Sequence, residues 1–143
     1  MLPIQISEAA YHTMKAHAEA AYPNECCGFF YGQEGEVRQI VEAREVVNSK
    51  EGDQRRRFEV SPLDYLRAEQ YADAAGLTLL GVYHSHPEHP AIPSEHDLRQ
   101  AVPFFSYIIL SVKSAQTVDL RSWQLNAEGA FEEENIKQQV HHS

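Results

Sequence analysis

The chain has 143 residues, 43% of them hydrophobic, and a formal net charge of −9 at pH 7. This length favours one domain over residues 1–143, and the hydrophobic fraction is sufficient for a core. The acidic charge argues against binding to a nucleic-acid backbone, whereas a basic protein tail or a small substrate is compatible with it.

The sequence shows no signal for export or for membrane insertion. Its first residues lack the basic region and the apolar run of a signal peptide, and no stretch approaches the roughly 18 apolar residues that span a bilayer. The two cysteines, Cys26 and Cys27, are adjacent, which is not the pattern of a disulfide framework. We therefore expect a cytoplasmic protein with no membrane partner.

The N-terminal part of the chain predicts a strand, a helix and a hairpin. Residues 4–6 favour a short strand, and residues 7–22 favour a helix with serine at its cap and an apolar stripe. Residues 26–31 form an apolar strand pattern, and residues 33–36 a turn into a strand over 37–47. Imperfect alternation in that last strand indicates a bulge or a break. The apolar stripe of the helix comprises Ala9, Met14, Ala18 and Ala21.

The middle of the chain predicts a loop, a short strand and a second helix. Residues 48–57 are polar and charged, which is typical of a mobile loop. Its three arginines, residues 55–57, form either a solvated turn or a cationic lip that meets an acidic partner or a C-terminal carboxylate. Residues 58–60 favour a strand. Residues 61–75 favour a helix, because Ser-Pro-Leu-Asp is a strong start signal and Gly76 a stop signal.

The rest of the chain alternates strands with one more helix start at Ser94. Residues 77–83 form a nearly continuous apolar run, as expected of a strand buried on both faces. Further strands are predicted over 107–112 and 118–125, with a hairpin partner from residue 130 onward. We expect a frayed tail from about residue 138 to 143. The order of elements predicts an α/β fold in which helices pack against a mixed sheet.

The densest group of metal-ligand side chains follows the apolar run at 77–83. His84 and His86 lie two residues apart at the end of the predicted strand, so both imidazoles point to one side and can reach one ion. After a proline-rich loop, Ser94 and Asp97 have the spacing of a capping box, which predicts a helix start facing the strand end. Two imidazoles and a carboxylate leave a fourth position open, as in catalytic zinc sites.

Each of these side chains also has a purely structural interpretation. Asp97 could serve only as the carboxylate of the capping box, although ligation and stabilisation of the helix dipole are compatible. Ser94 could be only the cap, or its hydroxyl could also donate a hydrogen bond to a developing oxyanion. His89 and His96 lie out of phase with the ligand pair, so we expect loop and exposed-helix positions for them, and His89 could contact a substrate.

Hydrolysis also needs a base that takes a proton from water and returns it to the leaving group. The chain has no H-E-x-x-H pattern, so the base does not share a helix with the ligands. Glu25 is the best candidate, since it follows a Pro-Asn turn and begins the apolar strand over 26–31. The alternative is a surface glutamate at a strand start, and the residues alone leave both interpretations open.

The pattern of Glu25, then H-S-H-P at 84–87, then S-E-H-D at 94–97 resembles the JAMM/MPN metalloprotease family. The motif of that family is a glutamate upstream of H-x-H-P, with S-x-x-D following seven residues after the second histidine. Residues 87–93 supply those seven residues here. The segments P-N-E-C-C-G, R-F-E-V-S-P and G-V-Y-H-S-H-P look like the small stand-alone bacterial members. The resemblance covers the chain from about residue 6 to 112.

This resemblance implies that His84, His86 and Asp97 bind zinc with water as the fourth ligand. Glu25 would be the general base, and Ser94 would stabilise the tetrahedral intermediate. The implied reaction cleaves peptide or isopeptide bonds after the C-terminal Gly-Gly of a ubiquitin-like or sulfur-carrier protein. The implied fold is a mixed, partly barrel-like sheet flanked by helices, related to zinc deaminases, whose own H-x-E and P-C-x-x-C signature is absent here.

A Gly-Gly tail could extend along a sheet edge into a groove too narrow for side chains, with residues 48–57 as one wall. The resemblance also allows two other functions. One is a catalytically inactive MPN-type scaffold module, against which the filled ligand positions argue. The other is a DNA-repair-associated JAMM-like domain, against which the acidic charge argues. The sequence leaves open the identity of the carrier, the type of scissile bond and the oligomeric state, for which a homodimer is one option.

Overall fold

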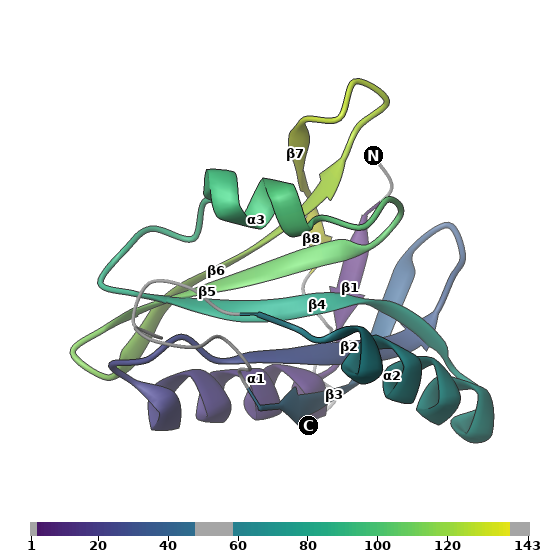
Figure 1. The fold of residues 1–143 in the computed structure, drawn as a ribbon, viewed down its shortest axis with the longest axis horizontal. Helices are drawn as coiled ribbons and strands as arrows, with labels where there is room; N and C mark the ends of the chain where they lie inside the picture. Colours follow the sequence, from purple (N-terminus) through teal and green to yellow (C-terminus); the bar gives the residue numbers. More distant parts are fainter. Residues whose placement is uncertain (1–2, 48–58, 138–143) are drawn as a thin grey trace.

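A computed structural model describes residues 3–47 and 59–137, and Figure 1 shows its fold. The predicted loop over 48–57, Phe58 of the predicted short strand and the predicted frayed tail over 138–143 lie outside the described residues. Glu59 and Val60 belong to no strand, so the prediction of a strand over 58–60 is wrong for the part that is described.

One mixed sheet contains every strand in the described ranges, in the order β7-β6-β5-β4-β2-β3-β1-β8. Strand β1 runs parallel to β3 and β8, β4 runs parallel to β5, and the other neighbours are antiparallel. The strands are β1 (Ile4–Ile6), β2 (Cys27–Gln33), β3 (Arg38–Val46), β4 (Thr78–Pro87), β5 (Ser106–Lys113), β6 (Gln116–Leu125), β7 (Phe131–Glu134) and β8 (Ile136–Lys137). The mixed α/β prediction is confirmed.

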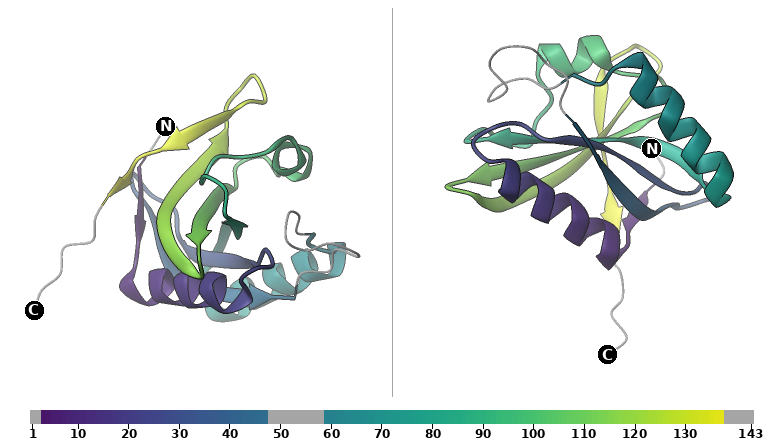
Figure 2. Two further views of the ribbon diagram at one scale, coloured as in Figure 1. Left: turned by 90° about the vertical axis from the view of Figure 1, so that its left-hand side faces the viewer. Right: turned by 60° about the horizontal axis from the view of Figure 1, so that its bottom comes forward.

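The sheet curls into a nearly closed barrel, as the left view of Figure 2 shows. Its two edge strands, β7 and β8, are consecutive in the chain and separated only by Asn135. The Asn135 carbonyl accepts a hydrogen bond from the amide of Ile4 at 3.0 Å. The last strands therefore connect the two edges of the sheet, and no sequence pattern had predicted β8.

The break expected in the strand over 37–47 is a β-bulge. Tyr31 of β2 pairs with Glu42, and the next residue, Gly32, pairs with Ile40, so Val41 of β3 has no partner across the strands. An unpaired residue of this kind locally bends a strand and increases its twist. Val41 is 41% exposed, as expected for a side chain that the bulge turns away from the core.

Helix α1 (Glu8–Ala21) packs on one face of the sheet. Ser7 caps it by accepting a hydrogen bond from the amide of Ala10 at 3.1 Å, as predicted. Its buried residues are Ala10, Met14 and Ala18. The predicted stripe is therefore correct at Met14 and Ala18 and also at Ala21, which is partly buried against the same core. It is wrong at Ala9, which is exposed because the helix buries the next residue instead.

Helix α2 (Pro62–Ala75) packs on the opposite face of the sheet through Ala68 and Ala72. A capping box begins it, and Gly76 ends it with a φ of +69°, a conformation that glycine adopts without strain. Strand β4 lies between the two helix-covered faces, and every residue after Thr78 in it is buried. No helix in residues 3–47 and 59–137 is long and apolar enough to cross a membrane.

Candidate metal centre

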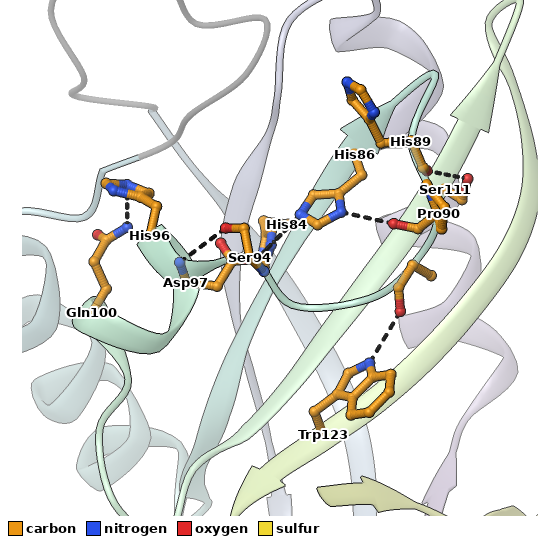
Figure 3. A network of polar contacts seen from close by, with 11 residues as sticks. His84, His86, His89, Pro90, Ser94, His96, Asp97, Gln100, Ser111 and Trp123 are labelled. Atoms are coloured by element: carbon orange, nitrogen blue, oxygen red, sulfur yellow. Dashed lines mark hydrogen bonds and ion pairs between the residues drawn. The ribbon is translucent and has the colours of Figure 1, made fainter. Parts of the chain in front are cut away.

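Strand β4 and the short helix α3 (Glu95–Gln100) bring two histidines and an aspartate together. His84 and His86 point to the same face because side chains alternate along a strand. Asp97 lies in the first turn of α3, which faces the end of β4 across the loop (Figure 3). All three side chains are buried, with His84 at 0% exposure.

The three nearest polar atoms of this cluster form an almost equilateral triangle. The two histidine Nε2 atoms are 3.1 Å apart. The Oδ2 atom of Asp97 lies 3.2 Å from the Nε2 atom of His84 and 3.2 Å from that of His86. These residues form the predicted group, and their arrangement could hold a metal ion.

The size and chemistry of this triangle fit a tetrahedral zinc ion. Zinc binds imidazole nitrogen and carboxylate oxygen at roughly 2.0–2.1 Å, so neighbouring ligand atoms of a tetrahedron lie about 3.3–3.4 Å apart. The observed separations of 3.1 and 3.2 Å come close to that edge length. The three side chains could therefore occupy one face of such a tetrahedron, and a fourth position would stay open.

The protonation states also suit metal ligation, which requires neutral imidazoles and an ionised carboxylate. The Nδ1 of His86 donates to the carbonyl of Pro90 at 2.8 Å, which leaves its Nε2 lone pair directed to the cluster. Burial lowers the pKa of His84, although the charge of Asp97 opposes this shift. Burial disfavours the ionised form of Asp97, but its contacts with His84, His86 and Ser94 hold its pKa below the usual range.

Asp97 takes part in the capping box predicted from the sequence. The amide of Ser94 donates to Asp97 Oδ2 at 2.9 Å, and the amide of Asp97 donates to Ser94 Oγ at 3.1 Å. The same carboxylate oxygen therefore caps the helix and faces both histidines. The Ser94 hydroxyl accepts this bond with a lone pair, which does not use its proton.

Glu25 lies two residues before β2, the strand that pairs with β4 and its two histidines. Cys27 of β2 pairs with His84 of β4, and the amide of Ser85 donates to the carbonyl of Cys26 at 3.2 Å. Continuing this antiparallel register by two residues places Glu25 opposite His86, and residues directly opposite each other share a face. Glu25 is only 6% exposed, so its alternative interpretation as a surface glutamate is wrong.

The environment of Glu25 makes its carboxyl group hold a proton. Burial raises its pKa to about 9, and the nearby negative charge of Asp97 contributes to the rise. A cation between the two carboxylates would oppose this effect, because an opposite charge favours the ionised form. The site therefore combines a group that could hold a metal with a carboxyl whose protonation responds to it.

The other two histidines of the segment lie outside the cluster, as expected. His89 is exposed, and its ring points away from the three ligand atoms in Figure 3. The Nε2 of His96 contacts the side chain of Gln100 one turn along α3, at 2.6 Å. Sequence reasoning missed the Pro90 carbonyl as a partner of His86. No residue pattern could indicate it, because that contact depends on the path of the loop.

Comparisons with known proteins agree on one family. Residues 7–126 match the Prok-JAB family, described as prokaryotic homologs of the JAB domain. A desampylase of Pyrococcus furiosus is 36% identical over 52% of this chain, and the match spans only about half of that relative, 49%. A CysO-cysteine peptidase of Mycobacterium bovis is 30% identical, with 87% of this chain and 84% of the relative covered. A probable TtuB-protein conjugate cleaving protease of Thermus thermophilus is 30% identical over 76% of this chain and 70% of its own length.

Solved structures show the same fold. The solution structure of a Desulfitobacterium hafniense protein is 31% identical, with a TM-score of 0.82 and coverage of 96% of this chain and 94% of that one. A JAB1/MPN domain protein of Archaeoglobus fulgidus has a TM-score of 0.56 over 94% of this chain and 97% of its own. At 20% identity, this second likeness concerns the fold alone.

Proposed function

Because the chain belongs to the prokaryotic JAB family, we propose that it is a zinc-dependent peptidase that acts on conjugates of a small ubiquitin-like or sulfur-carrier protein. The observation that carries this proposal is the buried triangle of two imidazole nitrogens and one carboxylate oxygen, 3.1–3.2 Å apart, beside a buried glutamate. The residues are those expected from the sequence: His84, His86 and Asp97 as ligands, with Glu25 and Ser94 as catalytic residues.

The metal ligands would be ready before an ion arrives. His86 is oriented by the Pro90 carbonyl, Asp97 is fixed by the Ser94 amide, and neither contact needs a metal. When bound, zinc supplies a Lewis acid that lowers the pKa of a water ligand to about 7 and polarises a carbonyl group.

Glu25 would act as the general base and then as the general acid. Two observations support this role: Glu25 is buried, and extending the β2–β4 register two residues past Cys27 and His84 would bring it opposite His86. The carboxylate accepts a proton from the attacking water and returns it to the leaving amine, so that the proton is neither gained nor lost over the cycle. In the metal-free protein burial raises the pKa of Glu25 to about 9, and a bound cation would favour the ionised carboxylate that accepts the proton.

Ser94 would donate its hydroxyl proton to the oxyanion that develops on the scissile carbonyl. The serine oxygen already accepts the amide of Asp97, which restricts its position next to the ligands. A donor held in place before the reaction stabilises developing charge without reorganisation. Removing one such donor typically lowers kcat by about 10²–10³-fold.

The substrate class is inferred from the names of the relatives and from the motif. The relatives are named a desampylase, a probable TtuB-protein conjugate cleaving protease and a CysO-cysteine peptidase. We propose a substrate with an extended C-terminal Gly-Gly, since two residues without side chains can pass through a narrow channel to a buried centre. The net charge of −9 does not suit a nucleic-acid substrate.

Metal analysis combined with Glu25→Gln tests this function. We expect about one zinc per chain in both proteins, and cleavage of a carrier protein fused after its Gly-Gly to a reporter only by the wild type. Glu36→Gln, an exposed glutamate in the turn between β2 and β3, is the matched control and should cleave normally. Normal cleavage by Glu25→Gln would overturn the mechanism. Zinc binding without cleavage of any carrier fusion would instead favour the inactive scaffold interpretation.

A further inference from the structure

The loop between β4 and α3 is held by side chains from three different strands, which Figure 3 shows together. Three consecutive carbonyl groups of this loop each accept one side-chain hydrogen bond. The three bonds are Ser111 Oγ to His89 O (2.5 Å), His86 Nδ1 to Pro90 O (2.8 Å) and Trp123 Nε1 to Ala91 O (3.1 Å). Their donors lie on β5, β4 and β6, respectively.

Burial of an apolar face does not hold helix α3 in place. Asp97 is its only buried residue, and Leu98, its one large apolar residue, is 41% exposed. A helix of this kind gains little from packing, because the apolar stripe that normally fixes a helix on a core is missing. The position of Asp97 must therefore depend on the chain segments on either side of α3.

The loop itself is also weakly held by burial. Residues 88–90 are exposed, whereas Ala91 is 1% exposed and lies where the Trp123 indole reaches its carbonyl. At its start, the Glu88 carboxylate accepts hydrogen bonds from the amide of Ser114 at 2.7 Å and from the hydroxyl of Tyr22 at 2.8 Å. Polar contacts to the backbone, rather than apolar packing, thus define most of the path from His86 to α3.

We propose that Ser111 and Trp123 are positioning residues for the metal centre. Neither side chain belongs to the predicted ligand set, and each bonds to a carbonyl of the loop that carries Asp97 toward the two histidines. Together they hold the loop in a path that keeps the Asp97 Oδ2 atom 3.2 Å from the Nε2 atoms of both histidines before a metal binds. This inference rests on the proposed function, because it requires that His84, His86 and Asp97 bind the ion.

The expected effect follows from preorganisation. A ligand's apparent affinity falls in proportion to the fraction of protein in the competent conformation. One net hydrogen bond of about 1 kcal/mol corresponds to roughly a fivefold change in the equilibrium constant between the competent and incompetent conformations. We therefore expect zinc to bind up to about 5-fold more weakly to Ser111→Ala and to Trp123→Phe, and up to about 25-fold more weakly to the double variant if the two contacts act independently.

The experiment measures zinc affinity of the full chain by competition with a chromophoric chelator. Trp123→Phe keeps an aromatic ring and loses only the N–H donor and part of the indole. Gln33→Ala is the matched control: it removes a side-chain bond to the Gly76 carbonyl at the end of β2 remote from Cys27 and His84. Met14→Ala destabilises the core without touching the loop and controls for stability. The visible spectrum of bound cobalt reports ligand geometry.

Weaker zinc binding and an altered cobalt spectrum in the two loop variants, with both controls like the wild type, would support the proposal. Unchanged zinc affinity in the double variant would overturn the positioning role while leaving the proposed function intact. Equal weakening in Met14→Ala would assign the effect to general stability and also overturn it. A wild-type protein that binds no zinc would overturn both the inference and the proposed metal centre.

Discussion

Glu25→Gln should change how the stability of the metal-free protein depends on pH. The Glu25 carboxyl is 6% exposed, and burial together with the charge of Asp97 raises its pKa from 4.5 to about 9. The unfolded chain releases this proton near its ordinary pKa, whereas the folded chain retains it until about pH 9. Between the two values the folded state binds more protons, so the free energy of unfolding falls as pH rises.

The magnitude follows from the width of that interval. Each pH unit between the two pKa values changes the free energy of unfolding by about 1.4 kcal/mol, which gives several kcal/mol in all. Glutamine has nearly the same shape and no titrating proton. The variant should therefore become progressively more stable than the wild type from pH 5 to pH 9.

Denaturant unfolding in the presence of a chelator, at pH 5, 6, 7, 8 and 9, measures this difference. Glu36→Gln removes an exposed glutamate and controls for the loss of one charge. Saturating zinc should flatten the difference, because a cation near Glu25 favours its ionised form. A difference between Glu25→Gln and the wild type that stays constant from pH 5 to pH 9 would refute the conclusion that Glu25 is a buried, protonated carboxyl beside Asp97.

Three further predictions concern the ligand set and the core. Asp97→Ala should abolish zinc binding, and the loss of its capping-box hydrogen bond should lower the free energy of unfolding by about 1 kcal/mol. Asp64→Ala, at the same capping-box position of α2, should lower stability by a similar amount but retain zinc in metal analysis. Zinc at about 1,000 times its Kd should stabilise the wild type by about 4 kcal/mol in denaturant unfolding, and a much smaller gain would mean that the unfolded chain binds zinc as well. Met14→Ala, at a fully buried position on the sheet-facing side of α1, should lower stability by about 2–5 kcal/mol, and a loss below 1 kcal/mol would show that the α1 face repacks.

Most helices and strands could be predicted from local sequence patterns, because the interactions that start and end them involve residues close together in the chain. Ser61-Pro62-Leu63-Asp64 and Gly76 bracket α2 through hydrogen bonds and backbone conformations of neighbouring residues. The apolar run before His84 predicted a buried strand, and β4 is buried after Thr78. The stripe of α1 was misplaced at Ala9, since apolar spacing does not determine which way a helix with many alanines rotates on a sheet.

The residues of the candidate metal site could also be predicted from the sequence. Whether their side chains meet, however, depends on the tertiary structure. Alternation along a strand places His84 and His86 on one face, and S-x-x-D predicts the cap that orients Asp97. Whether the Asp97 carboxylate meets both imidazoles depends on a loop of seven residues. That loop follows its path because Ser111 and Trp123, on strands formed later in the chain, reach its carbonyl groups.

The residue types of the candidate ligands, the helix caps and most of the strands follow from the sequence, because they depend on side-chain chemistry and on the periodicity of neighbouring residues. Three features depend on the tertiary structure, because no local pattern encodes them. These features are the burial of Glu25 next to β2, the joining of the two sheet edges through β7 and β8, and the separations of 3.1–3.2 Å within the candidate ligand triangle. Each of these arises from pairing between segments far apart in the chain, where strand register and loop path set the distances.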